Sequence, residues 1–280
     1  MTGLKLLAVS TKYWRPGEDY LKEIVEAVKD RVVDYDFVVV SEKAISIALN
    51  NIVDESRVRP GLSARWIAGF WMRRIWGYFL GPMCRLRQRL LVQLRAYPLD
   101  VGSRHKQVAL ERAGLLQALM FGSEGGIDGS NLPYSYVSLP LKVADAIAEK
   151  ICLQIRASSG KNVFVMVSDT DKTYSFKSFH FTPRPKPFRG IHSFGGFATY
   201  IIGRMLKLER RATPLAVAGC SISAEAALRV AEAANRARGF GAGRTVWDMA
   251  EMFRVHLANV SWEMLDTVKH KPIVIVRKRR

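Results

Sequence analysis

The sequence predicts a mixed α+β protein, and three observations support this fold class. Short β-branched runs such as Phe37 to Val40 (FVVV) fit buried strands. Apolar residues repeat every four positions at Ile147, Ile151 and Ile155, which is typical of a helix. The 280 residues are 49% hydrophobic, so the chain can bury an ordinary core. Without an internal repeat or a low-complexity linker, we expect one domain over residues 1–280.

The first part of the chain predicts a strand, a helix and a second strand. Leu4 to Val9 fits the first strand, and Asp19 is placed to cap the helix that follows. That helix carries its apolar residues at helical spacing: Leu21, Ile24, Val25, Val28 and Val32. FVVV predicts the second strand, and SEKAIS (41–46) is expected at its carboxyl end.

The middle of the chain predicts a helix followed by a strand. The helix that carries the four-residue repeat is expected to end at Gly160. NVFVMVS (162–168) then predicts a strand, with Asp169 and Thr170 at its exit.

The last part predicts two strands and two helices. Thr213 to Gly219 and the closing PIVIV fit strands. Ala224 to Arg238 is rich in alanine and predicts a helix that Gly239 caps. A second helix should begin near Val246, because Thr245 and Asp248 have the spacing of a capping pair.

The composition is strongly basic. A formal net charge of +18 implies an anionic partner, such as a nucleotide, a nucleic acid, a phosphorylated substrate or a membrane surface. Residues 57–112 carry twelve Lys or Arg against two acidic residues, a net of +10, with interleaved aromatic residues. We expect this segment to be helical. Arg73 and Arg74 interrupt its most apolar stretch, so we expect neither a membrane-spanning helix nor a membrane partner.

The cysteines and the N-terminus favour a cytoplasmic protein. Cys84, Cys152 and Cys220 are far apart and form no CxxC pair, which argues against a zinc site or a disulfide framework. The N-terminal apolar run is only Leu6 to Val9, too short for a signal peptide.

Three features could carry chemistry, and each has a structural alternative. Asp128 in GGIDGSN lies among glycines that allow close approach, although Asp and Gly also favour turns. Asp169 follows a buried strand, where ligands often bind, although such an Asp also often caps a helix. GFGAGR (239–244) precedes a helix and can bind an anion, or it serves as a helix cap and a connection.

Taken together, these segments resemble the F420-0:gamma-glutamyl ligase family. The resemblance rests on GIDGSN (126–131), on the strand followed by Asp169 and Thr170, and on the glycines after a helix bearing Ala234 and Asn235. PGED (16–19) and SEKAIS also match the family in order and rough spacing.

The resemblance implies a mixed-sheet fold, an intertwined homodimer and a ligase that uses GTP (or ATP) with Mg²⁺ or Mn²⁺, as two ions. The substrates would be an F420-0-like acid and L-glutamate. Asp128 and Asp169 would be catalytic and would bind metal together with Thr170, because hard cations prefer oxygen ligands. The residues expected to bind the nucleotide are Thr11, Lys12, Glu42, Lys43, Asn131, Gly239, Gly241 and Gly243.

The chain departs from the family pattern at a few positions. Lys172 and Thr173 stand where the family usually has Gly and Arg, Ile47 replaces a Lys, and Phe240 replaces an acid or an amide. We therefore expect replacement cations to bind the substrate, from Lys172, Arg184, Arg204, Arg189 or segment 57–112.

Three functional hypotheses follow. The first is an acid–amino-acid ligase that works through an acyl phosphate. The second is a nucleic-acid-binding protein that uses segment 57–112, because Trp66, Phe70, Trp71, Trp76 and Tyr78 are interleaved with arginines. The third is a sensor that binds nucleotide without turnover.

Overall fold

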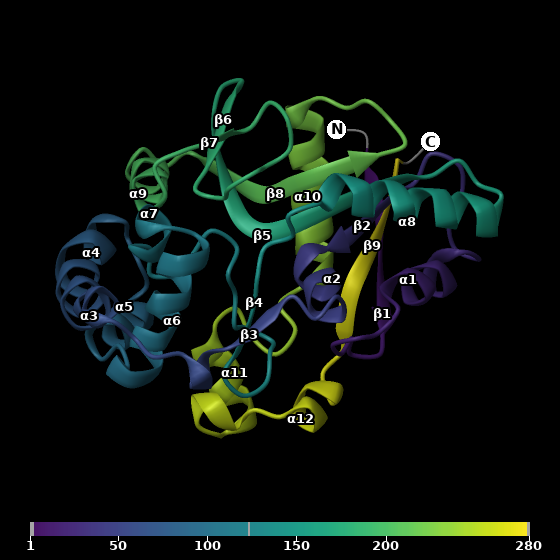
Figure 1. Ribbon diagram of the computed structural model, residues 1–280. Coiled ribbons are helices and arrows are strands. Elements are labelled where there is room, and N and C mark those ends of the chain that lie inside the picture. The colour runs from purple at the N-terminus through teal and green to yellow at the C-terminus, as the bar shows by residue number, and fades with distance from the viewer. Residues whose placement is uncertain (1–2, 123, 279–280) are drawn as a thin grey trace.

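The computed structural model describes residues 3–122 and 124–278, and its fold is a mixed α+β arrangement around one large sheet (Figure 1). The strands are β1 (Leu4–Thr11), β2 (Phe37–Ser41), β3 (Ile52–Asp54), β4 (Tyr136–Ser138), β5 (Phe164–Phe176), β6 (Phe179–Thr182), β7 (His192–Ser193), β8 (Glu209–Ala218) and β9 (His270–Lys278). The main helices are α1 (Tyr20–Val28), α2 (Glu42–Ala48), α8 (Ala144–Ser159), α9 (Phe197–Met205), α10 (Ala224–Arg238), α11 (Val246–Phe253) and α12 (Trp262–Asp266). The 3₁₀ turns are η1 (Glu55–Arg57) and η3 (Leu257–Asn259).

The sheet contains both parallel and antiparallel pairs. Its strands follow the order β1-β9-β2-β5-β6-β7, and β8 pairs with the other edge of β5. β2 runs parallel to β5 and antiparallel to β9, so the C-terminal strand lies between the first two strands of the chain. This arrangement confirms the predicted mixed sheet.

Alternating side chains of the central strands pack on two opposite faces of the sheet. Val38 and Val40 pack with α1 and α8, whereas Val39 packs with α10. All three valines are fully buried, as expected for a strand covered on both faces.

The basic segment forms a separate group of helices beside the sheet (Figure 1). The group comprises α3 (Leu62–Trp66), a π-helix η2 (Ile67–Leu80), α4 (Gly81–Met83), α5 (Gln88–Arg95), α6 (Leu99–Arg112) and α7 (Leu115–Ala118). Its own apolar core includes Trp76 and Leu94 and extends to residues near Asp128, including Ile127. Within the described ranges, none of the helices combines the length and the apolarity that crossing a bilayer requires.

Local sequence patterns correspond closely to several elements. Asp19 caps α1 through its side chain, Gly160 ends α8 in the left-handed conformation, and Thr245 accepts a hydrogen bond from the Asp248 amide at the start of α11. α10 ends at Arg238, with Gly239 at φ +77°. These predictions are confirmed.

The prediction that a strand ends at Ser168 is wrong. β5 continues through Asp169 and Thr170 to Phe176, and its register against β8 shifts between Asp169 and Lys172. Pairing with β8 and β6 extends this polar stretch as a strand. Asp169 therefore lies at an irregularity within a strand, not at a strand exit or a helix cap.

Candidate active site

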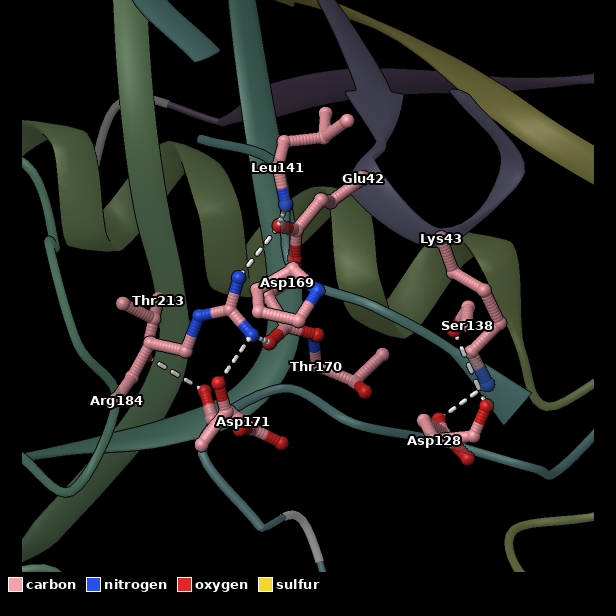
Figure 2. Close-up of polar contacts among 12 residues, drawn as sticks. Glu42, Lys43, Asp128, Ser138, Leu141, Asp169, Thr170, Asp171, Arg184 and Thr213 are labelled. Carbon is pink, nitrogen blue, oxygen red and sulfur yellow. Dashed lines mark hydrogen bonds and ion pairs between the residues drawn. The ribbon is translucent and has the colours of Figure 1, made fainter. Parts of the chain in front are cut away.

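A cavity of about 1030 Å³ lies between the sheet and the helical group. It is large enough for two ligands, since single-ligand pockets typically occupy about 300–1,000 Å³. Both Asp128 and Asp169 line this cavity, so the two carboxylates predicted to act together face the same space. Figure 2 shows the residues around them.

Asp128 is held in a tight turn beside β4. Its backbone exchanges hydrogen bonds with Ser138, and its Oδ1 accepts a hydrogen bond of 2.7 Å from the Ser130 amide. The turn geometry that the sequence left as an alternative is therefore present, and the carboxylate still lines the cavity.

Lys43 is the counterion of Asp128. Its Nζ forms an ion pair with Asp128 Oδ2 and donates hydrogen bonds to the carbonyl oxygen and Oγ of Ser130, at 2.9 and 2.8 Å. Figure 2 shows the lysine pointing from the start of α2 toward the aspartate. The lysine therefore neutralises the carboxylate and fixes its turn.

Asp169 pairs with a different cation, Arg184. Its Oδ2 lies 3.1 Å from Arg184 Nη1, and its Oδ1 accepts a hydrogen bond of 2.6 Å from the Thr170 amide. Arg184 is only 1% exposed, and its guanidinium also bonds Glu42 at 2.5 Å (Figure 2). It donates a further hydrogen bond of 3.1 Å to the Gly125 carbonyl oxygen. Arg184, which we expected to bind substrate, joins three internal partners and is not among the residues that line the cavity.

Glu42 is the buried end of this ion network. Burial raises its pKa to about 7, Arg184 acts in the opposite direction, and Asp169 adds to the increase. Its Oε1 also accepts a hydrogen bond of 2.7 Å from the Leu141 amide. Burial lowers the pKa of Arg184, but Asp169 and Glu42 outweigh it, so the pKa is raised and the guanidinium is charged.

A glycine is needed at position 126 because the Arg184 side chain occupies the space of a Cβ. The φ of Gly126 is +96°, and a Cβ added there would lie 1.0 Å from Arg184 Nη1. The sequence suggested that the glycines around Asp128 allow a ligand to approach. At Gly126 the approaching group is an arginine of the same chain.

Asn131 holds the glycine loop rather than pointing a free amide into the cavity. Its Nδ2 donates to the carbonyl oxygens of Gly243 and Phe240, at 3.0 and 3.3 Å, and its Oδ1 accepts a hydrogen bond of 2.6 Å from the Ala242 amide. Gly241 has φ +57°, and a Cβ there would come within 2.5 Å of Asn131 Oδ1. Asn131 and the three loop glycines, expected at the nucleotide, all line the cavity.

The structure brings most, but not all, of the expected site residues to the cavity. Thr170, Lys43 and Lys172 line it, and Lys172 Nζ lies 3.2 Å from Glu232. The expected residues outside the cavity lining are Thr11, Lys12, Glu42, Arg184, Arg189 and Arg204.

The cations outside the lining have other partners. Lys12 bonds Glu18 and Glu23, and Arg204 donates to the carbonyl oxygens of Cys84 and Arg85. Arg204 thus connects α9 to the helical group.

Sequence analysis missed Arg238, which lines the cavity at the end of α10. Asn235, noted only as part of the family pattern, lies one turn earlier and also lines it. Their spacing of three places both on one helix face next to the glycine loop. That spacing was visible in the sequence.

The oxygen donors around Asp169 suit a hard divalent cation. Asp169 Oδ2 is buried with Arg184 as its ion-pair partner, and the Thr170 hydroxyl and the Asp128 carboxylate line the same cavity. In residues 3–122 and 124–278, no three His, Cys, Asp or Glu side chains group closely enough to hold a metal. Asp128 is already paired with Lys43, so a cation there must compete with an ammonium group.

A comparison with known protein families shows to which family the chain belongs. The family model described as F420-0:Gamma-glutamyl ligase matches residues 8–179. The chain belongs to the F420-0:gamma-glutamyl ligase family. The match includes Asp128, Asp169 and the helical group, and it ends before α10 and the glycine loop.

The similarity to one relative extends over nearly the whole chain of this F420 ligase family member. "Uncharacterized protein MJ1361" of Methanocaldococcus jannaschii is 33% identical over 287 residues, which is 98% of this chain and 96% of that protein. Family membership indicates a ligase role. The similarity to MJ1361 also covers the part of the chain that carries Arg238.

Proposed function

We propose that the protein is a nucleotide-dependent ligase that joins a substrate carboxylate to L-glutamate, as in glutamylation of F420-0. One observation carries the proposal: two carboxylates from distant segments face one cavity large enough for two substrates, in a chain of this family. The GTP or ATP phosphates would lie between these carboxylates and the basic residues of the cavity wall.

The proposed reaction has two steps. A carboxylate oxygen of the acceptor attacks the γ-phosphorus of the nucleotide, and the bond to the β-phosphate oxygen breaks, giving an acyl phosphate and a nucleoside diphosphate. The amine nitrogen of glutamate then attacks the acyl carbon. Phosphate leaves with the bonding electron pair, and the amine loses a proton.

The side chains have distinct tasks in this scheme. Asp128, Asp169 and Thr170 would hold Mg²⁺ or Mn²⁺, which neutralises phosphate charge in such transfers. Arg184 orients Asp169 by its ion pair. Lys43 pairs with Asp128, and it would be placed to contact a phosphate oxygen if a cation took its place at that carboxylate.

The central test removes one carboxylate charge at a time. In Asp128→Asn and Asp169→Asn we expect metal-dependent nucleotide turnover to fall by about 100-fold or more, because each loses a charge that holds the cation against the phosphates. Asp30→Asn is the matched control, since Asp30 is exposed in a turn outside the cavity. Full turnover in both site variants, measured by phosphate release, contradicts the proposal.

The substrate combination requires a separate experiment. Product formation is measured with an F420-0-like acid and L-glutamate, with GTP or ATP and with Mg²⁺ or Mn²⁺. Nucleotide binding without amide formation for any acid would favour the sensor hypothesis instead.

A second candidate function has a specific observation behind it. Trp66, Phe70 and Tyr78 of the helical group are about half exposed, at 53%, 46% and 50%, next to exposed arginines. Such rings can stack on nucleic-acid bases. Trp71 and Trp76, by contrast, donate to the Leu119 carbonyl oxygen and contribute to the core or its edge. Salt-dependent binding to single-stranded RNA that is lost in Trp66→Ala would support this function.

We further propose that the protein is a cytoplasmic homodimer. Leu4, Leu6 and Leu7 of the edge strand β1 are exposed, as are Trp66 and Phe79. These residues provide apolar surface for a second copy, and sedimentation analysis measures the mass directly.

A further inference from the structure

Arg238 is a cavity residue whose guanidinium lacks a partner. Its Nε and Nη2 are buried and make no hydrogen bond to any described residue. None of the ion pairs of the described residues includes it. Burial lowers its pKa to about 10, and Asp169 acts in the opposite direction without forming an ion pair with it.

Two buried arginines of this chain show how buried guanidinium nitrogens are normally satisfied. Arg184 bonds Glu42 and Asp169, and Arg211 bonds Glu225 and Ser175. Buried charges in proteins are generally paired, because an unpaired one loses its hydration without compensation. Arg238 therefore requires an anion that the described residues do not supply.

Asn235 provides a second, independent observation. It is 6% exposed, lines the same cavity one turn before Arg238, and its Oδ1 has no hydrogen-bond partner among the described residues. An unmatched acceptor next to an unmatched donor group indicates a ligand with both an anionic oxygen group and a hydrogen-bond donor.

Among the described residues, no carboxylate of the cavity wall bonds the two buried nitrogens of Arg238. Glu232 lines the cavity on α10, but it already bonds Lys172, Arg236 and the Ala212 amide. Asp169 is taken by Arg184. Asp171 also lines the cavity, but it bonds neither Arg238 Nε nor Arg238 Nη2. Cations on this side are Arg210, Arg236, Arg244, Lys269 and Lys271.

We infer that Arg238 and Asn235 form a substrate subsite in which the guanidinium binds an anionic oxygen group and the amide oxygen accepts a hydrogen bond from the same molecule. This inference rests on the proposed function for the identity of the molecule. Both the nucleotide, through its phosphates and hydroxyls, and the amino acid, through its carboxylates and ammonium group, offer this chemistry. Arginine suits either group, because its planar fork bonds phosphate and carboxylate alike.

The test measures melting-temperature shifts of the full-length protein with two probes, inorganic tripolyphosphate and L-glutamate. We expect at least one probe to raise the melting temperature of the wild type. Arg238→Gln should weaken binding of that probe by about 10-fold to 100-fold, because hydrogen bonds to charged groups are lost. Loss with tripolyphosphate assigns the subsite to the nucleotide, and loss with glutamate assigns it to the amino acid.

Two controls separate binding from folding. Arg229→Gln removes a charge from the exposed side of the same helix and should leave both shifts unchanged. Without a probe, Arg238→Gln should melt at or above the wild-type temperature, because it removes an uncompensated buried charge. A fall of several degrees would instead assign Arg238 a structural role and overturn the inference.

Asn235 gives an additional readout. Asn235→Leu should weaken glutamate binding if the ammonium is the donor, and GTP or ATP binding if a nucleotide hydroxyl is the donor. Unchanged binding of every ligand in both Arg238→Gln and Asn235→Leu overturns the inference, as does a wild type that neither probe stabilises. A protein that binds a probe through Arg238 but forms no amide contradicts the proposed ligase and leaves the subsite intact.

Discussion

The helical group and the sheet side of the cavity differ in how their charged side chains are compensated. In the helical group, arginines such as Arg89 and Arg112 are exposed, while the buried Lys106 and the partly buried His105 are neutralised by Glu124 and Glu55. On the sheet side, Arg238 is partly buried, and its buried Nε and Nη2 have no hydrogen-bond partner among the described residues. Residues 57–112 hold over half of the net charge, yet the unmatched charge lies outside them.

This difference shows that charge density and charge compensation are separate properties. An exposed arginine is solvated by water and indicates little about a specific ligand. A buried group without a partner indicates a missing one, because desolvation must be offset in the functional state. We therefore expect substitutions of compensated buried charges to reduce stability, and substitution of Arg238 to reduce binding.

The largest expected effect is at Arg184. Arg184→Met should cost about 3–5 kcal/mol of unfolding free energy, because it leaves buried Glu42 and Asp169 without their shared cation. Urea unfolding measures this loss. Arg238→Met is the matched comparison and should cost little or nothing. Equal losses in the two variants would remove the distinction between compensated and uncompensated arginines.

A somewhat smaller effect is expected at Lys106 in the helical group. Lys106 is fully buried, and its Nζ bonds Glu124 and the Met120 carbonyl oxygen. Lys106→Met should cost about 3 kcal/mol, because Glu124 keeps only His105 as a cation. Thermal or urea unfolding measures the change, with Lys150→Met on the exposed face of α8 as the control. A cost within 0.5 kcal/mol of the control, the range typical of surface substitutions, would show that the group is not held by this pair.

Elements set by local interactions were predictable from the sequence. The helix from Ala224 to Arg238 has the predicted bounds, because a Ser223 cap and a positive-φ Gly239 define its ends. Burial on both faces of the sheet follows from the β-branched run of β2.

Features that depend on distant residues were not predictable. The polar stretch after Ser168 stays in β5 because β8 and β6 pair with it, and no local pattern indicates this pairing. We expected Arg184 to bind substrate. Its pairing with Glu42 could not be predicted, because the two residues are 142 positions apart in the sequence. Only the family resemblance predicted that Asp128 and Asp169 line one cavity. The sequence could not show that two nitrogens of Arg238 lack a partner among the described residues, because this depends on the three-dimensional structure.

The smallest expected effect is a pH dependence of stability that comes from His105 in the helical group. His105 lies between Glu55 at 2.7 Å and Glu124 at 3.2 Å. Burial lowers the pKa of His105, but the two carboxylates outweigh it and raise the pKa to about 10. Because the folded pKa exceeds the ordinary value of about 6.5, the stabilisation is complete below pH 6.5 and is lost as pH rises toward 10.

The measurement compares wild type with His105→Gln by urea unfolding between pH 6.5 and 8.5. The stability advantage of the wild type should fall by at most ~1.4 kcal/mol per pH unit, the limit for one proton. The difference between the two proteins removes the contribution of Glu42, whose raised pKa of about 7 gives a slope of the same sign. A constant difference across this window would mean that His105 is neutral in the folded protein. A buried acid beside the helical group would then lack a compensating charge. The helical group would no longer differ from the sheet side of the cavity in charge compensation.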